Sequence, residues 1–249
     1  MKNLLFFIIG FITCFGAKAE CSAEGISFYP AGKHITPASV FVIEGYFNSQ
    51  SQIHKIGKDV LLYLSAGDGR IQLKVADLCI SDFYLTQAIL KPETNLEPGK
   101  EYSLEVVSLN KKEPLNQYLL SNEKYKVEIP GKAVDLKFNA LPEIFSKNYV
   151  PYGCGPAKSV NFNLNTNLLP ALVKATLTNK KNGNATSYYL KPNEFGILEI
   201  GHDMCSGAFT FYPGEEYTIR FDLVDSEGKI TAWQGKPVEF SWLESDEKI

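Results

Sequence analysis

The sequence has little net charge and few histidines. Its 249 residues include 25 lysines and arginines and 28 aspartates and glutamates, which gives a formal net charge of −3 at pH 7. Because a nucleic acid is held largely by an excess of basic side chains on its phosphates, we expect no nucleic-acid partner. The three histidines, His34, His54 and His202, lie in no motif that assigns a catalytic role, and we expect them at surface or turn positions.

Three common catalytic motifs are also absent. The sequence contains no Gly-x-Ser-x-Gly turn of a serine hydrolase, no His-Glu-x-x-His helix of a zinc protease and no Gly-x-x-x-x-Gly-Lys phosphate loop. We therefore expect no catalytic residue, no cofactor and no metal. A glycoside hydrolase stays open as an alternative, because two carboxylates that act together in space need not be close in the sequence.

The only long apolar run lies at the N-terminus. Lys2 precedes an apolar stretch over residues 4–16, and Ala17, Lys18 and Ala19 follow it, which is the order that signal peptidase recognises. The stretch is about 13 residues long, whereas a membrane-spanning helix needs about 20. We expect residues 1–19 to be a cleaved signal peptide and the mature protein to act in the periplasm or outside the cell.

A lipid anchor is the competing interpretation of this region. Cys14 and Cys21 lie near the expected cleavage site, but Cys14 follows Thr13 inside the apolar stretch and Cys21 follows Glu20. Neither position fits the short motif of a lipid-modified cysteine well. No later segment is apolar enough to span a bilayer, so we expect no transmembrane segment after signal removal.

Cysteine is scarce, with five residues in the chain. Once Cys14 leaves with the signal peptide the number is even, which favours disulfides in an exported protein. Cys21 and Cys79 lie in the first half of the mature chain, and Cys154 and Cys205 lie in the second. Three pairings are open to four cysteines, and the simplest prediction is one bridge within each half.

Cys205 could alternatively be a ligand in a zinc site. His202 and Asp203 lie close to it in the sequence, but no Cys-x-x-Cys or His-x-x-x-His spacing supports such a site. We therefore favour the disulfide over the metal.

Apolar and polar residues alternate along much of the mature chain, which is the pattern of half-buried antiparallel strands. Turn residues at 67–69 and 182–183 separate pairs of such segments and predict two hairpins. Only residues 82–90 and 115–120 resemble short helices. The clearest alternation covers residues 71–75, 125–129, 160–164, 217–223 and 238–242.

One short motif occurs twice, about 115 residues apart, as expected for a chain of two similar units. It reads LEPGKEYSL at residues 96–104 and FYPGEEYTI at residues 211–219. In each copy, proline followed by glycine predicts a tight turn, because proline fixes φ and glycine tolerates a positive φ. The tyrosine that follows, Tyr102 or Tyr217, then enters a strand with its hydroxyl free to bond upstream backbone.

The Leu-x-Pro-Gly-x-x-Tyr pattern resembles the corner before a late strand in fibronectin type III and related bacterial immunoglobulin-like domains. The resemblance covers about nine residues in each half and implies an all-β chain of two antiparallel β-sandwich (immunoglobulin-like) domains in tandem. It implies no active site. Pro130 and Gly131 interrupt the alternation between the two copies. We place the domains at residues 20–130 and 131–249.

Several aromatic residues at turn-like positions are candidate ligand contacts, since sandwich domains present loops on a rigid support. The best candidates are Tyr149 and Tyr152, which lie beside Cys154. Aromatic residues are also common in strands, so each of them could instead be a half-buried strand residue. The full set is Tyr149, Tyr152, Tyr188, Tyr189 and Trp233.

Together these features predict a non-enzymatic binding or scaffold protein of the cell envelope that recognises a protein or a glycan through its sandwich loops. One alternative is a single large, jelly-roll-like β-sandwich enzyme that acts on extracellular polysaccharide. Another is a purely structural pair of domains with no ligand pocket.

Overall fold

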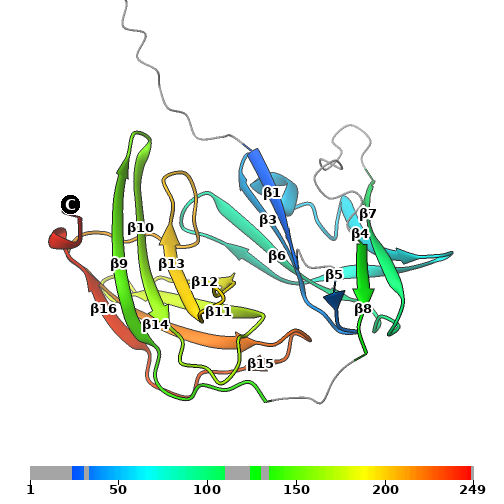
Figure 1. Ribbon diagram of the computed structural model, residues 1–249. Helices are drawn as coiled ribbons and strands as arrows, with labels where there is room; N and C mark the ends of the chain where they lie inside the picture. Colours follow the sequence, from blue (N-terminus) through cyan, green and yellow to red (C-terminus); the bar gives the residue numbers. More distant parts are fainter. Residues whose placement is uncertain (1–23, 31–33, 110–123, 130–134, 248–249) are drawn as a thin grey trace, which may run out of the picture.

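The computed structural model describes residues 24–30, 34–109, 124–129 and 135–247, and these residues form an all-β structure with one short helix and one 3-10 turn (Figure 1). The expected signal peptide, Cys21, the expected junction at residues 130 and 131, and the helix expected at 115–120 lie outside these ranges. Within the described ranges, no helix has the length and apolar character needed to cross a membrane.

The described strands before residue 130 form one sheet of eight strands in the order β1-β3-β6-β5-β4-β7-β8-β2. Neighbouring strands are antiparallel except β2 and β8, which are parallel. The helix α1 (Gln50–Ile53) follows β3. The strands are β1 (Glu24–Tyr29), β2 (His34–Ile35), β3 (Phe41–Phe47), β4 (Val60–Ala66), β5 (Gly69–Ile80), β6 (Leu85–Pro92), β7 (Glu101–Ser108) and β8 (Lys124–Val127).

The described strands after residue 134 form two further sheets. One has three strands in the order β13-β10-β9, and the other has five, in which β12, β11, β14 and β15 are neighbours and β16 also pairs with β14. The last described element is the 3-10 turn η1 (Glu244–Glu247). The strands are β9 (Glu143–Tyr152), β10 (Gly155–Asn163), β11 (Leu172–Asn179), β12 (Ala185–Leu190), β13 (Ile197–His202), β14 (Glu215–Val224), β15 (Ile230–Thr231) and β16 (Val238–Trp242).

The predicted hairpins are present, and so are the strands predicted from alternation, although the one at 125–129 ends at Val127 and the one at 160–164 ends at Asn163. The helix predicted at 82–90 is wrong. This segment contains β6, in which Leu85 to Leu90 are all buried. A strand covered on both faces lacks the regular alternation of apolar and polar residues, so periodicity alone does not distinguish it from a buried helix.

The first half has its own hydrophobic core, here called the N-terminal core. Phe28 of β1 and Phe41 of β3 lie against Tyr125 of β8, with ring centroids 6.3 and 5.6 Å from that of Tyr125. Strands near opposite edges of the eight-stranded sheet therefore face each other across this core, so the sheet is strongly bent.

A second core, here called the shared core, lies between the three- and five-stranded sheets and extends to the first half. Phe162 of β10 meets Phe221 of β14 at a centroid distance of 5.1 Å, so these two sheets face each other. Val42 and Ile89 of the eight-stranded sheet also belong to the shared core, whereas Ile43 belongs to the N-terminal core. Alternate residues of β3 thus serve two cores, and the halves are packed together.

Gln87 of β6 joins the two halves through a pair of hydrogen bonds to β12. Its side-chain Nε2 donates to the carbonyl of Tyr189 at 2.9 Å, and its Oε1 accepts the N–H of Tyr189 at 3.1 Å. β12 is the edge of its sheet, so the Gln87 amide occupies the place of a neighbouring strand. Gln87 is 2% exposed, and these bonds are shielded from water.

An ion pair between Asp77 and Lys174 lies at the same interface, and it should make the stability of the protein depend on pH. Burial alone would raise the pKa of Asp77, but Lys174, whose Nζ lies 3.0 Å away, together with the Leu78 N–H and the Tyr189 hydroxyl, lowers it. Because the pKa of Asp77 is lower in the folded state than in the unfolded state, the ionised carboxylate stabilises the fold at pH values above its unfolded pKa of 3.8. That contribution is lost as the pH falls through the pKa of the folded state. The stability difference between wild type and Asp77→Asn, measured by denaturant unfolding, should therefore shrink on acidification. A difference that stays constant down to pH 3 would contradict this.

Both copies of the repeated motif form the predicted corner. The hydroxyls of Tyr102 and Tyr217 accept backbone N–H groups five residues upstream, at 3.2 and 2.9 Å. Gly99 and Gly214 have φ of 82° and 79°, and each N–H donates at 2.7 Å to the last strand of its half, at Val127 and Trp242 respectively. The two corners thus share these hydrogen bonds, and the Tyr217 hydroxyl in addition donates to Glu215 Oε2 at 3.3 Å.

Removing either corner hydroxyl should destabilise the protein, because a part-buried backbone N–H would lose its acceptor. We expect Tyr102→Phe and Tyr217→Phe each to lower the free energy of unfolding by about 1 to 2 kcal/mol. Tyr63→Phe is the control, since no hydrogen bond from the Tyr63 hydroxyl is present among the described residues and its ring instead contacts Arg70. Equal effects for all three, measured by chemical denaturation, would argue against the corner bonds.

Candidate binding groove

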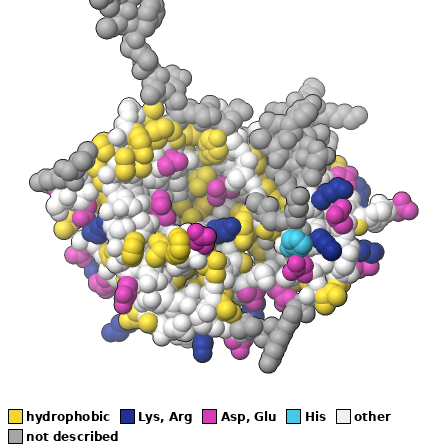
Figure 2. Space-filling model, in the orientation of Figure 1, with side chains coloured by type: hydrophobic (Ala, Val, Ile, Leu, Met, Phe, Trp, Pro, Cys, Tyr) yellow, Lys and Arg dark blue, Asp and Glu magenta, His cyan; other side chains and the backbone are white. Residues whose placement is uncertain are grey.

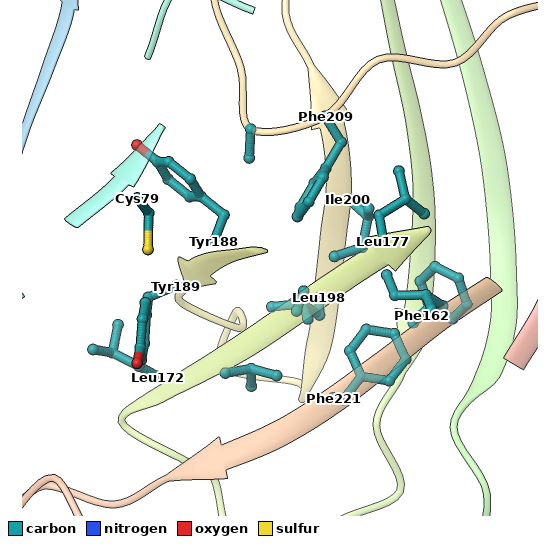
Figure 3. Close-up of a cluster of buried hydrophobic side chains, with 14 of the residues drawn as sticks. Cys79, Phe162, Leu172, Leu177, Tyr188, Tyr189, Leu198, Ile200, Phe209 and Phe221 are labelled. Atoms are coloured by element: carbon teal, nitrogen blue, oxygen red, sulfur yellow. The ribbon is translucent and has the colours of Figure 1, made fainter. Parts of the chain in front are cut away.

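Three of the predicted ligand contacts are buried, so that prediction is wrong for them. Tyr188 and Tyr189 of β12 are 0% and 7% exposed and belong to the shared core, where Cys79 of the first half lies beside them (Figure 3). Trp233 is also buried; its Nε1 donates to the Lys236 carbonyl at 3.0 Å. The first half covers β12, which is why two consecutive tyrosines are buried.

Tyr149 and Tyr152 lie on β9, in a long hairpin with β10 that projects from the three-stranded sheet (Figure 1). Tyr149 packs partly against the shared core, and Tyr152 is 51% exposed. Their role as ligand contacts stays a prediction.

The predicted cysteine bridges are not the ones in the structure. Cys79 is a free, buried cysteine and therefore does not pair with Cys21. Cys205 is disulfide-bonded, but within the described residues no bond joins it to Cys154. The alternation of β5 turns Cys79 towards the shared core, a placement that sequence spacing does not show.

The burial of Cys79 predicts slow thiol chemistry. Burial, with a smaller contribution from Asp77, raises the pKa of Cys79 to about 11, so almost no thiolate forms at neutral pH. We expect Cys79 to resist iodoacetamide in the folded protein and to react readily in denaturant, as peptide mass spectrometry can measure. Equal labelling rates in both states would contradict its burial.

The histidines divide between surface and interior. His34 and His54 are exposed, as expected, but His202 at the end of β13 is 9% exposed. Burial lowers the pKa of His202, and its Nδ1 lies 2.7 Å from the Asp203 carbonyl. Asp203 Oδ1 accepts the N–H groups of Cys205 and Ser206. In the described part of the chain, no group of three His, Cys, Asp or Glu residues is placed to hold a metal ion.

An open groove of about 1110 Å³, here called the β13 groove, lies along the outer face of the three-stranded sheet. Figure 2 shows this face, where hydrophobic and acidic side chains are interspersed. Asn161 of β10 and Glu199 of β13 are cross-strand partners on its floor, while their neighbours Phe162 and Leu198 are buried beneath. The groove is lined by Phe145, Asn161, Leu169, Lys191, Pro192, Asn193, Glu194, Phe195, Ile197 and Glu199.

A β-bulge places Phe145 at one wall of the β13 groove. Ser146 pairs with Asn161 and Ile144 pairs with Phe162, which leaves Phe145 as the extra residue between them. A bulge redirects side chains on its strand. Phe145 is 69% exposed, which is unusual for a large apolar side chain in a strand.

The loop between β12 and β13 forms the opposite wall and is held by its own hydrogen bonds. Asn193 Oδ1 accepts the N–H groups of Phe195 and Ile197, both at 3.0 Å. Gly196 adopts a φ of 75°, which favours glycine. These hydrogen bonds hold the turn in place, and the Phe195 ring at its tip is 78% exposed. Binding of a ligand would therefore not carry the entropic cost of ordering the loop.

The β13 groove combines two apolar ring faces with polar groups between them. Asn161 can donate and accept hydrogen bonds, and the carboxylates of Glu194 and Glu199 accept them. Lys191 is partly engaged, because its Nζ lies 5.2 Å from the centre of the Tyr29 ring. Such a surface suits a ligand with apolar faces and several hydrogen-bond donors.

Sequence reasoning missed both phenylalanines of the groove. Phe145 lies in a segment that reads as a strand, and the bulge that exposes it breaks the period of two. Phe195 stands between Asn193 and Gly196, and that turn signal could have identified it as an exposed loop residue.

No protein-family model and no curated protein matches the chain. Among solved structures, a pullulanase from Anoxybacillus sp. LM18-11 in complex with maltotriose is 10% identical over 82% of this chain and 24% of that chain, with a TM-score of 0.26. The Escherichia coli adhesin FdeC is 11% identical over 88% of this chain and 64% of that chain, with a TM-score of 0.23.

The Yersinia pseudotuberculosis adhesin InvE is 12% identical over 88% of this chain and 58% of that chain, with a TM-score of 0.23. The chain therefore spans about a quarter of the pullulanase and less than two thirds of either adhesin. Likenesses of this size carry no argument about function.

Proposed function

We propose that the chain is an exported, non-enzymatic binding module of the cell envelope that recognises a protein or a glycan through the β13 groove. The observation that carries this proposal is the pair of exposed rings, Phe145 and Phe195, on opposite walls of one groove. Large apolar groups left in water at a concave polar site are typical of an interaction surface.

The proposal includes two immunoglobulin-like units, at residues 20–130 and 131–249. The two matching corners support it, as does the change of sheet between β8 and β9. Because the halves share a core, the first unit acts as a support that holds β12, and with it the start of the groove loop, in place.

Binding by the purified protein to fractionated envelope glycans and envelope proteins tests the proposal. The double variant Phe145→Ala, Phe195→Ala should bind its ligand at least about tenfold more weakly, which corresponds to about 1.4 kcal/mol. Tyr212→Ala is the matched control, because Tyr212 is 57% exposed and lies outside the groove.

Undiminished binding by the double variant would show that the groove is not the site. If the wild-type protein hydrolysed a glycan, and Glu194→Gln or Glu199→Gln abolished this activity, the result would favour the alternative of an enzyme that acts on polysaccharide over a binding module.

A further inference from the structure

A second cavity, here called the inter-half cleft, lies between the eight-stranded sheet and the loop that follows β13. Its volume is about 520 Å³. Glu44, Tyr46 and Leu85 line it from the first half, and Asp203, Ser206 and Gly207 line it from the second. The two sides are held together at this point, since the Gly207 N–H donates to the Phe83 carbonyl at 2.8 Å.

Glu44 supplies a partly buried carboxylate to this cleft. It lies in β3 between Ser27 of β1 and Gln87 of β6. Its Oε2 accepts the Tyr188 hydroxyl at 2.8 Å and the Gln87 Nε2 at 3.2 Å. These bonds fix the position of the carboxylate without neutralising it.

No cation compensates this charge among the described residues. Burial raises the pKa of Glu44, and the described groups that oppose this shift are the neutral side chains of Tyr188 and Gln87. Of the described residues that line the cleft, none is a lysine, arginine or histidine. Removing part of a carboxylate from water without a cationic partner is unfavourable, and a bound cation would offset that cost.

The other walls also favour a positively charged group. Asp203 adds a second carboxylate, of which Oδ1 is engaged by the N–H groups of Cys205 and Ser206. The ring of Tyr46 lies so close to Gly25 that a Cβ there would be 1.9 Å from Tyr46 Cε1, so this glycine makes room for the ring. An aromatic face beside two carboxylates is suited to an ammonium group.

We propose that the inter-half cleft binds an alkylammonium group, such as a lysine side chain or a diamine, with Glu44 as its anionic partner. The site is distinct from the β13 groove, with which it shares no lining residue. This proposal therefore does not depend on the proposed function of the β13 groove.

Calorimetric titration of the full-length protein with cadaverine, and separately with N-acetyl-lysine methylamide, tests this. Both probes should bind wild type, and pentane-1,5-diol, which lacks the charge, should not. Glu44→Gln should weaken binding at least about tenfold. The glutamine can still accept from Tyr188 and Gln87, so this variant should fold with an unchanged or higher Tm.

Glu199→Gln in the β13 groove is the matched control and should bind both probes as wild type does. Cadaverine binding that is lost in Glu199→Gln but kept in Glu44→Gln would overturn the proposal. So would binding of the diol as strong as that of the diamine, a result that does not depend on any variant.

Discussion

Replacing Gln87 with alanine should lower the free energy of unfolding by about 3 kcal/mol, because it leaves the N–H and the carbonyl of Tyr189 without partners in a shielded interface. The Gln87 side chain makes both bonds at once, at 3.1 and 2.9 Å, and also donates to Glu44. The substitution should lower the stability of both halves together, since β12 and β6 contribute to one shared core.

Denaturant unfolding followed by circular dichroism measures this effect. Gln234→Ala is the control, because Gln234 is exposed and its side chain, among the described residues, bonds to the nearby Ala232 carbonyl alone. Its effect should stay within about 0.5 kcal/mol. Two separate transitions, with only one shifted by Gln87→Ala, would contradict the joint packing of the halves.

Phe162→Ala should lower the free energy of unfolding by more, about 3 to 5 kcal/mol, because it removes a fully buried ring from between the three- and five-stranded sheets. Phe162 of β10 contacts Phe221 and Phe240 of the facing sheet at centroid distances of 5.1 and 5.8 Å. The cavity would lie directly beneath the floor of the β13 groove, so ligand binding should weaken together with stability.

Asn161→Ala is the matched control for Phe162→Ala, one residue away on the opposite face of the same strand. Asn161 faces the groove and bonds to Ser146 Oγ at 3.0 Å. We expect a loss of stability within about 1 kcal/mol, with weaker ligand binding. A thermal and chemical denaturation series in which both variants lose equal stability would contradict the assignment of the two faces.

The features that could be predicted from the sequence are those fixed by neighbouring residues. Alternation placed the strands, and proline with glycine before Tyr102 and Tyr217 predicted both corners with their hydroxyl bonds. These features depend on local steric and hydrogen-bonding preferences, which a short segment contains in full.

The features that could not be predicted depend on contacts between distant segments. Tyr188 and Tyr189 are buried only because the first half covers β12, and β6 resembles a helix only because it is covered on both faces. Cys79 faces the shared core rather than another cysteine. Phe145 is exposed by a bulge whose position depends on the pairing of β9 with β10.

Site-specific photo-crosslinking in the intact cell envelope tests the binding groove most directly. A photoreactive residue in place of Phe145 or Phe195 should capture the same envelope protein or glycan at both positions, and the capture should be lost with Glu199→Gln. The same residue in place of Tyr212, which is exposed outside the groove, should capture nothing. Capture at Tyr212 alone, or equal capture at all three positions, would contradict recognition through the β13 groove.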